Sequence, residues 1–259
     1  MENLTEILDA ATEIAQQGSE MALSYFRKAI LIEIKENLTP VTIADKKTEE
    51  FMRKELIQAF PGFGILGEEF GEESANNEYV WTIDPIDGTR SFIRGIPLFG
   101  TLLGLLRNGE PILGVMVLPG LKETYSAAKG LGTYCNGHQV HTTPVSHLDT
   151  SSIGLGDAYA FRETGTENIF NHLSKTCELA RGYTDCFGHA LVLRGALDAM
   201  VDPLVSIWDV APLAILAEEA GGEYFSFEGE KTIRSKSFVT CGPKLKEDVL
   251  AAIAKSKLK

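Results

Sequence analysis

The sequence predicts a protein of mixed α and β structure, built as one large domain or as two closely packed halves. Apolar residues near the N-terminus recur at helical spacing, and short apolar runs rich in β-branched and aromatic residues follow along the chain. Turns that contain Gly and Asn separate these runs. With 259 residues and 44% hydrophobic content, the chain is long enough to bury a sizeable core.

The N-terminal part is expected to alternate helices with short strands. Residues 4–29 place apolar side chains on one helical face. A short strand is expected at 30–34, and the segment 41–45 should lead into a second amphipathic helix that ends before Pro61. Asp45 falls where this helix begins, which leaves two interpretations open: an acid that starts the helix, or a functional carboxylate.

The middle of the chain predicts a series of strands. A short strand at 63–69 ends in two acids, and a polar loop follows it. The next strand, 79–83, is apolar and should stop at Asp84, because Pro85 has no N–H for a ladder. Hairpin and turn signals separate the remaining strands. These are expected at 98–106, 111–118 and 125–128, in a segment that ends at Cys135, and at 139–142.

The composition turns polar at 144–150, where we place the boundary between an N-terminal half, residues 1–147, and a C-terminal half, residues 148–259. The second half again alternates strands and helices. Strands are expected at 151–155, 181–185, 199–202, 223–227 and 238–241, and helices at 165–179, 187–195, 210–220 and 245–254.

The composition also limits the class of function. The net charge of −12, with no block of five or six basic residues, argues against nucleic acid or a membrane as a partner. No apolar run reaches the roughly 18 residues that span a membrane, and the N-terminus does not resemble a signal peptide. The four cysteines lack a C-x-x-C spacing, which favours buried reduced thiols in a cytoplasmic protein over a zinc site.

The strongest signal for chemistry lies directly after the second of the middle strands. Asp84 and Asp87 flank a proline-stiffened turn, and Gly88 and Thr89 follow at the start of a short helical pattern. Such a turn offers hard oxygen ligands to a metal ion, including the Ile86 carbonyl, and free amides to a phosphate. Asp-Pro and Asp-Gly are ordinary turn dipeptides, but their combination at a strand-to-helix junction favours a metal and phosphate site.

Three motifs resemble the metal-site motifs of the inositol monophosphatase family, in order and spacing, over nearly the whole chain. They are Gly67-Glu68-Glu69, Trp81-Thr-Ile-Asp84-Pro-Ile-Asp87-Gly-Thr89, and Trp208-Asp209 followed by Gly221-Gly222. The combination is highly specific, whereas no single motif is. The resemblance implies a fold of the α+β or α/β class. Its layers would form an α-β-α-β-α sandwich of the sugar-phosphatase type with two mixed sheets. Most metal ligands would lie in the N-terminal half, and the last ligand and the substrate wall in the C-terminal half.

The resemblance also implies Mg²⁺ as the cofactor, with two or three ions held by Glu68, Asp84, Asp87, Asp209 and the Ile86 carbonyl. This donor set agrees with the preference of Mg²⁺ for carboxylate and carbonyl oxygens. Two ions about 4 Å apart can clamp a phosphoryl group and polarise an attacking water. Because gathered acids repel one another, the site is expected to be partly disordered without cations.

Catalytic roles implied by the resemblance fall on Asp45, Thr89 and Glu68. Thr89 and Asp45 would orient the nucleophilic water, with the Thr89 hydroxyl accepting or relaying its proton. The amides of Gly88 and Thr89 would hold the phosphate. No side chain of these motifs is an obvious general acid, so the leaving alkoxide is expected to be stabilised by metal.

Within the family, two stretches look most like the histidinol-phosphatase branch: Asp87 to Pro97, and Asp185 to Gly195 followed by Met200 to Pro203. Inositol phosphatases are similar at the metal motifs but typically carry a small neutral residue where Asp185 stands. Alternatively, Asp185 caps the helix that follows it. The resemblance places four residues on the substrate side: Arg90, Asp185, His189 and Asp202.

These features predict a metal-dependent phosphatase that hydrolyses histidinol phosphate to histidinol and phosphate in histidine biosynthesis. The alternative is an inositol-1-monophosphatase, or another phosphatase of this family for a small sugar or nucleotide phosphate. A third alternative is an inactive phosphate- or metal-sensing domain. Such a domain usually lacks a metal ligand or the water-orienting pair. Here all of the expected metal ligands and both members of the pair, Asp45 and Thr89, are present. The resemblance further implies a homodimer.

Overall fold

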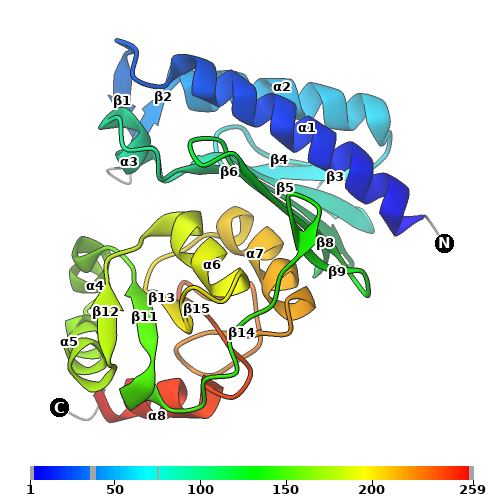
Figure 1. Ribbon diagram of the computed structural model, residues 1–259. Coiled ribbons are helices and arrows are strands. Elements are labelled where there is room, and N and C mark those ends of the chain that lie inside the picture. The colour runs from blue at the N-terminus through cyan, green and yellow to red at the C-terminus, as the bar shows by residue number, and fades with distance from the viewer. Residues whose placement is uncertain (1–2, 36–38, 75, 257–259) are drawn as a thin grey trace.

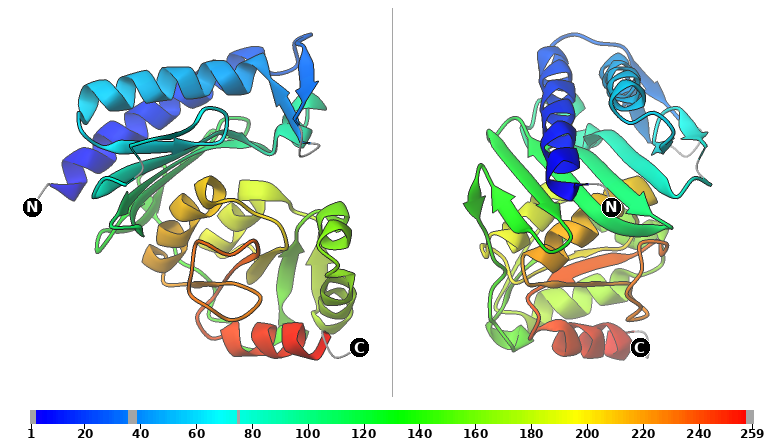
Figure 2. Two further views of the ribbon diagram at one scale, coloured as in Figure 1. Left: turned by 180° about the vertical axis from the view of Figure 1, so that it is seen from behind. Right: turned by 90° about the vertical axis from the view of Figure 1, so that its right-hand side faces the viewer.

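The computed structural model describes residues 3–35, 39–74 and 76–256, and these residues form an α-β-α-β-α layered sandwich (Figure 1). Outer helices cover one face of a large sheet, a middle helical layer separates it from a smaller sheet, and a third helical layer covers the far side (Figure 2). From top to bottom these layers contain α1 (Leu4–Tyr25) and α2 (Ile43–Ala59), then α6 (Asp185–Leu193) and α7 (Ile207–Glu219), then α4 (Ala158–Glu163), α5 (Glu167–Thr176) and α8 (Lys246–Ser256).

The larger sheet has eight strands in the order β10-β9-β8-β7-β6-β5-β3-β4. It is mixed, because β3 and β5 run parallel while β5 and β6 run antiparallel. Its strands are β3 (Gly64–Gly67), β4 (Gly71–Glu73), β5 (Tyr79–Asp87), β6 (Gly100–Arg107), β7 (Glu110–Leu118), β8 (Glu123–Ala128), β9 (Gly132–Cys135) and β10 (His138–Gln139).

The smaller sheet has five strands in the order β12-β11-β13-β15-β14, and it is also mixed. These strands are β11 (Ser152–Leu155), β12 (Leu179–Arg181), β13 (Ala199–Asp202), β14 (Glu223–Phe225) and β15 (Phe238–Cys241). Beside the short helix α3 (Thr89–Ile93) lies a separate hairpin of β1 (Ile32–Ile34) and β2 (Pro40–Thr42) (Figure 1). The predicted sandwich with two mixed sheets is confirmed.

Several predicted elements of the second half were displaced. The strand expected at 181–185 is β12, which lies earlier because it pairs in parallel with β11. The helix expected at 165–179 covers only Glu167–Thr176, and the helix expected from 187 begins at Asp185. Helix α4 was missing from the prediction. These short segments depend on partners that are distant in sequence, which local patterns do not identify.

The middle helical layer approaches the larger sheet closely at one pair of glycines. Gly104 on β6 pairs with Gly114 on β7, and both lie under Pro212 of α7. A Cβ on Gly114 would lie 2.4 Å from the Pro212 carbonyl oxygen, so no side chain fits there. The buried core of this layer joins Leu102 and Met116 of the sheet to side chains of α7. Helix α7 therefore belongs to the second half in sequence but packs on the sheet of the first.

The sheets divide where the boundary at 147 and 148 was drawn, yet the core continues across it, and the two-part division stays a prediction. Two cysteines, Cys186 and Cys241, are buried, while Cys135 and Cys177 are only half-buried, and all four are free thiols. In the part of the chain that the structure describes, no helix has the length and apolarity to cross a membrane.

Gly114→Ala is expected to reduce the free energy of unfolding by about 1–3 kcal/mol, because the added methyl group would push against the backbone of α7. Urea denaturation measures the change. Gly182→Ala is the matched control, since a Cβ at Gly182 meets no atom within 4 Å. Equal stability of both variants would show that α7 can move away from the sheet freely.

Candidate active site

Asp84 and Asp87 stand at the end of β5, where this strand carries one extra residue relative to β6. Asp84 pairs with Leu102 and Asp87 with Gly100, so three steps along β5 match two along β6. Residues three apart in a regular strand point to opposite faces, and a one-residue bulge brings them to the same side. The prediction that the strand stops at Asp84 was wrong, because Pro85 lies in the bulge, where no ladder hydrogen bond is needed.

Glu68 reaches the same place from the neighbouring strand. β3 runs parallel to β5, Gly67 pairs with Ile83, and the Glu68 amide donates to the Ile83 carbonyl at 3.1 Å. The carboxyl ends of parallel strands meet at one edge of a sheet, so Glu68 emerges beside Asp84. After burial, the charge of Glu68 is the largest cause that raises the pKa of Asp84.

Asp209 enters the site from the first turn of α7. Its Oδ2 accepts a hydrogen bond from the Ser206 amide at 2.8 Å, as the third residue of a capping box does. The Asp209 carboxyl also interacts with that of Asp84. Burial raises the pKa of Asp209 well above its ordinary value, and the charge of Asp87 raises it further. Segments from three parts of the chain therefore bring their acids together.

The electrostatics of this group are dominated by mutual repulsion in a buried environment. Burial raises the pKa of Asp84 well above its ordinary value, and the charges of Glu68, Asp87 and Asp209 add to that effect. Burial also raises the pKa of Asp87, although hydrogen bonds from Cys186 oppose the shift. Among the described residues, no three His, Cys, Asp or Glu side chains are arranged to hold a metal ion. The site therefore gathers negatively charged carboxylates, but their side chains do not by themselves form a metal-binding arrangement.

Lys35 supplies a counter-charge that the sequence analysis did not identify. Its Nζ lies 2.8 Å from Glu68 Oε1 and 2.7 Å from Glu69 Oε1. Burial alone would lower the pKa of Lys35, but the contacts with Glu68 outweigh it and the pKa is raised. Lys35 lies 33 residues before Glu68 and belongs to none of the motifs, so no local signal could have identified it.

Asp45 serves the start of α2 and the site at the same time. Its Oδ2 accepts hydrogen bonds from the amide (2.8 Å) and hydroxyl (2.6 Å) of Thr42, the N-cap residue. Its Oδ1 faces the Thr89 hydroxyl at 3.3 Å, and that hydroxyl lies 2.9 Å from the Ile86 carbonyl oxygen. The helix-start interpretation of Asp45 is therefore seen at Oδ2, while Oδ1 lies beside Thr89 and its functional role stays a prediction.

Asp185 opens α6 in a left-handed conformation, with φ of 58°. Its carboxylate does not cap this helix, because Thr184 is the N-cap residue and its hydroxyl donates to Asp185 Oδ2 at 2.8 Å. Burial raises the pKa of Asp185 to about 8, and the nearby charges of Asp87, Asp202 and Asp157 contribute. A Cβ on Gly88 would lie 3.2 Å from Asp185 Oδ2, so this carboxylate borders the turn after β5.

His189 and Asp202 form a buried pair behind Asp185. His189 Nε2 lies 2.9 Å from Asp202 Oδ2, and His189 Nδ1 lies 2.8 Å from Thr240 Oγ1. With 2% exposure and both ring nitrogens engaged, His189 holds Asp202 in place, and its predicted place on the substrate side stays a prediction. We call Asp157, Asp185 and Asp202 the acidic wall.

Helix α4 adds residues that the sequence analysis missed. Asp157 is its N-cap and accepts a hydrogen bond from the Tyr159 amide at 2.9 Å. The Tyr159 ring lies 5.6 Å from the guanidinium of the exposed Arg90 and 5.3 Å from that of Arg162. Tyr159 thus contacts Arg90 of α3 with its ring and Asp157 of the acidic wall with its amide. An Asp before a short amphipathic segment was the available signal for this helix.

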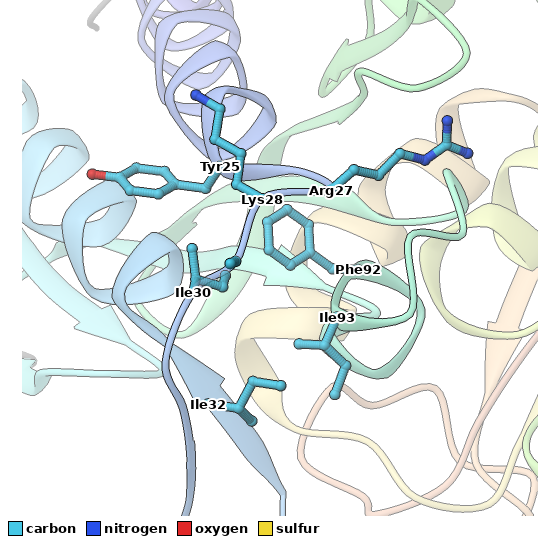
Figure 3. A pocket seen from close by; sticks show the side chains of 8 residues that line it. Tyr25, Arg27, Lys28, Ile30, Ile32, Phe92 and Ile93 are labelled. Atoms are coloured by element: carbon cyan, nitrogen blue, oxygen red, sulfur yellow. The ribbon is translucent and has the colours of Figure 1, made fainter.

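Two surface hollows lie away from these residues. One of about 120 Å³ is formed on α3, where Phe92 and Ile93 face Ile30 and Ile32 across the hollow (Figure 3). The other, of about 360 Å³, lies between the 3₁₀ turn Leu148–Thr150, α5 and α8. Neither is lined by any predicted site residue, so the site is defined by its converging side chains.

Comparison with known proteins matches residues 3–258 to the model of the inositol monophosphatase family. A histidinol-phosphatase of Chlorobaculum parvum is 35% identical over 96% of this chain and 97% of its own length. An inositol monophosphatase of Dictyostelium discoideum is 32% identical over 93% of each chain. The solved structure of an inositol monophosphatase from Anabaena (Nostoc) superposes with a TM-score of 0.87 at 30% identity, over 98% of this chain and 97% of that one.

The chain therefore belongs to the inositol monophosphatase family, whose members are phosphatases that act on small phosphorylated substrates. The family is generally metal-dependent. The resemblance stated from the three motifs is confirmed. The relatives include both histidinol-phosphatases and inositol monophosphatases, so the comparisons define the class of enzyme and leave its substrate to the site.

Asp84→Asn is expected to raise the melting temperature of the chelator-treated protein at pH 7. The pKa of Asp84 is raised in the folded state, so this carboxyl stabilises the fold below its unfolded pKa, and that stability is lost as pH rises through the folded value. Asparagine removes the repulsion at neutral pH. The gain should be about 2–4 °C for each kcal/mol of repulsion relieved, as measured by differential scanning calorimetry.

In the unaltered protein, Mg²⁺ should raise the melting temperature with increasing concentration, and Asp84→Asn should lose most of that rise. Turnover of the variant should fall by orders of magnitude, because the substitution removes the Asp84 charge from the centre of the acidic group. Asp149→Asn, a change at an exposed position, is the control. Full activity of the chelated protein, or of Asp84→Asn, would contradict a metal site at Asp84.

Proposed function

We propose that the protein is a Mg²⁺-dependent phosphomonoesterase that hydrolyses histidinol phosphate to histidinol and phosphate. The observation that carries the proposal is the position of Asp185, whose carboxylate lies beside Gly88 and among the charges of three other aspartates. A substrate with an ammonium group and an imidazole would offset this repulsion, whereas neutral hydroxyls would not. The similarity to histidinol-phosphatases supports the same choice.

The donor set fits Mg²⁺. Glu68, Asp84, Asp87 and Asp209 would hold two or three ions together with the Ile86 carbonyl, and all of these donors are the hard oxygens that Mg²⁺ prefers. When bound, Mg²⁺ would offset the repulsion among the carboxylates, polarise the phosphoryl group and make a water more acidic. Burial and the charges of neighbouring carboxylates raise the pKa values of Asp84 and Asp209, and a bound cation would oppose both shifts.

The residues of the chain orient the substrate and move the proton. The amides of Gly88 and Thr89 would bind the phosphate, because Gly88, with φ of 83°, is the N-cap of α3 and the first amides of a helix have no acceptor within it. The Thr89 hydroxyl would accept a proton from the attacking water while passing its own to Asp45 Oδ1, at 3.3 Å. The water oxygen would bond to phosphorus as the bond to the leaving oxygen breaks, the leaving alkoxide would take up a proton from solvent, and Asp45 would release its own to restore the site.

Thr89→Ala removes this hydroxyl but keeps the backbone amide. The value of kcat should fall far more than KM rises, because the lost interaction acts in the transition state. Steady-state kinetics with p-nitrophenyl phosphate measures both constants. Thr89→Ser, which restores the hydroxyl, should recover much of the turnover. A raised KM with an unchanged kcat would make Thr89 a phosphate ligand only.

Asp185→Asn should lower kcat/KM for histidinol phosphate by about ten- to a hundredfold. A hydrogen bond between a carboxylate and an ammonium is worth roughly 1.5–3 kcal/mol, and asparagine keeps the shape without the charge. Hydrolysis of p-nitrophenyl phosphate, which has no ammonium, should be nearly unchanged. Equal losses on both substrates would assign Asp185 a structural role and remove the main support for histidinol phosphate.

The alternative is an inositol monophosphatase, which is favoured by the Dictyostelium relative and by the solved Anabaena structure. Phosphate release from histidinol phosphate, inositol 1-phosphate and 3′-phosphoadenosine phosphate, each with Mg²⁺, distinguishes the candidates. We expect the highest kcat/KM with histidinol phosphate. A preference for inositol 1-phosphate would reject the proposed substrate and keep the proposed chemistry.

A further inference from the structure

Glu49 is a fully buried carboxylate outside the residues assigned so far. It lies on the inner face of α2 with 0% exposure. Its Oε2 accepts a hydrogen bond from the Glu69 amide at 2.7 Å, and its Oε1 accepts one from the Phe70 amide at 3.2 Å. Burying a carboxylate is costly unless several donors compensate for the lost water. Here two of the donors belong to the turn that follows Glu68.

Arg53 completes this contact from one helical turn further along α2. Its Nε donates to Glu49 Oε1 at 2.8 Å, and its Nη2 donates to the Gly71 carbonyl. Arg53 Nη1 also lies 3.8 Å from Glu73 Oε2. The pair therefore holds both arms of the turn between β3 and β4, which carries Glu68 and Glu69.

Glu49 also lies against the strand directly before Glu68. A Cβ on Gly67 would lie 2.0 Å from Glu49 Oε1, so only a glycine allows the carboxylate this position. Glu68 is thus bracketed, with Gly67 in contact on one side and the Glu69 amide hydrogen-bonded on the other. The side-chain direction of Glu68 follows from a backbone that Glu49 restrains at both neighbours.

We propose that Glu49, supported by Arg53, is a positioning residue that directs Glu68 into the metal site. The inference rests on the proposed function in one respect, which is that Glu68 ligates Mg²⁺. An apolar side chain could fill the same space without a buried charge. It would leave the Glu69 and Phe70 amides without an acceptor, and the turn would move to reach water.

Glu49→Gln tests this role, because it keeps the size of the side chain while one acceptor oxygen becomes an NH₂ donor. We expect Mg²⁺ to bind about ten- to a hundredfold more weakly, the usual effect of losing a group that orients a metal ligand. Isothermal titration calorimetry measures that affinity. Hydrogen exchange of the Glu69 and Phe70 amides should accelerate in parallel.

Glu50→Gln is the matched control, since it makes the same change one residue along α2, on a side chain that is 62% exposed. It should leave Mg²⁺ affinity and both exchange rates unchanged. With p-nitrophenyl phosphate, Glu49→Gln should need more Mg²⁺ for half-maximal rate but keep most of its kcat at saturation. A lower melting temperature with unchanged Mg²⁺ affinity would reduce Glu49 to a stabilising residue and overturn the proposal.

The double variant Glu49→Gln/Arg53→Met covers the case in which the single variant does not fold, since it leaves no unpaired buried charge. It should bind Mg²⁺ as weakly as the single variant, and normal binding would overturn the proposal. Failure of the unaltered protein to bind Mg²⁺ would reject the proposed function itself. Normal binding by the unaltered protein and by Glu49→Gln alike would reject only the positioning role.

Discussion

The one-residue bulge at the end of β5 is the constraint on which the rest of the site depends. Without it, Asp87 would point to the opposite face of the sheet from Asp84. The bulge leaves backbone groups outside the ladder, and side chains satisfy them: the Ile86 amide donates to Asp84 Oδ1, and the Thr101 hydroxyl donates to the Pro85 carbonyl. The irregular backbone therefore depends on a side chain of the acidic group, because Asp84 accepts a hydrogen bond from one of its free amides.

Two of the acids come from helix starts, and both use their oxygens in the same way. Asp45 and Asp209 are the third residues of capping boxes, with one oxygen bonded to the backbone of the N-cap residue. The helix N-terminus favours a negative charge there, which offsets part of the repulsion in the site. Each helix start thus orients a carboxylate whose second oxygen faces the site, so helix formation and site assembly depend on the same residue.

The other charges around the site come from contacts between distant segments. Lys35 reaches Glu68 from the hairpin before α2, and Glu49 reaches the turn after Glu68 from within α2. Asp157 joins Asp185 from a helix that local patterns did not predict. Hydrophobic periodicity and turn residues carry no information about such pairs, because each partner taken alone resembles an ordinary charged surface residue.

The sequence by itself determined the order of strands and helices through most of the first half and the acids at β5, because apolar period, proline and glycine act over a few residues. The layered class of fold followed from the resemblance of the three motifs to a known family. Tertiary structure decided the extent of β5 past Pro85, the start of α6 at Asp185, and the burial of His189 behind Asp202. These features depend on strand register and on close packing, as where α7 meets Gly104 and Gly114. Such contacts exist only once distant segments have met.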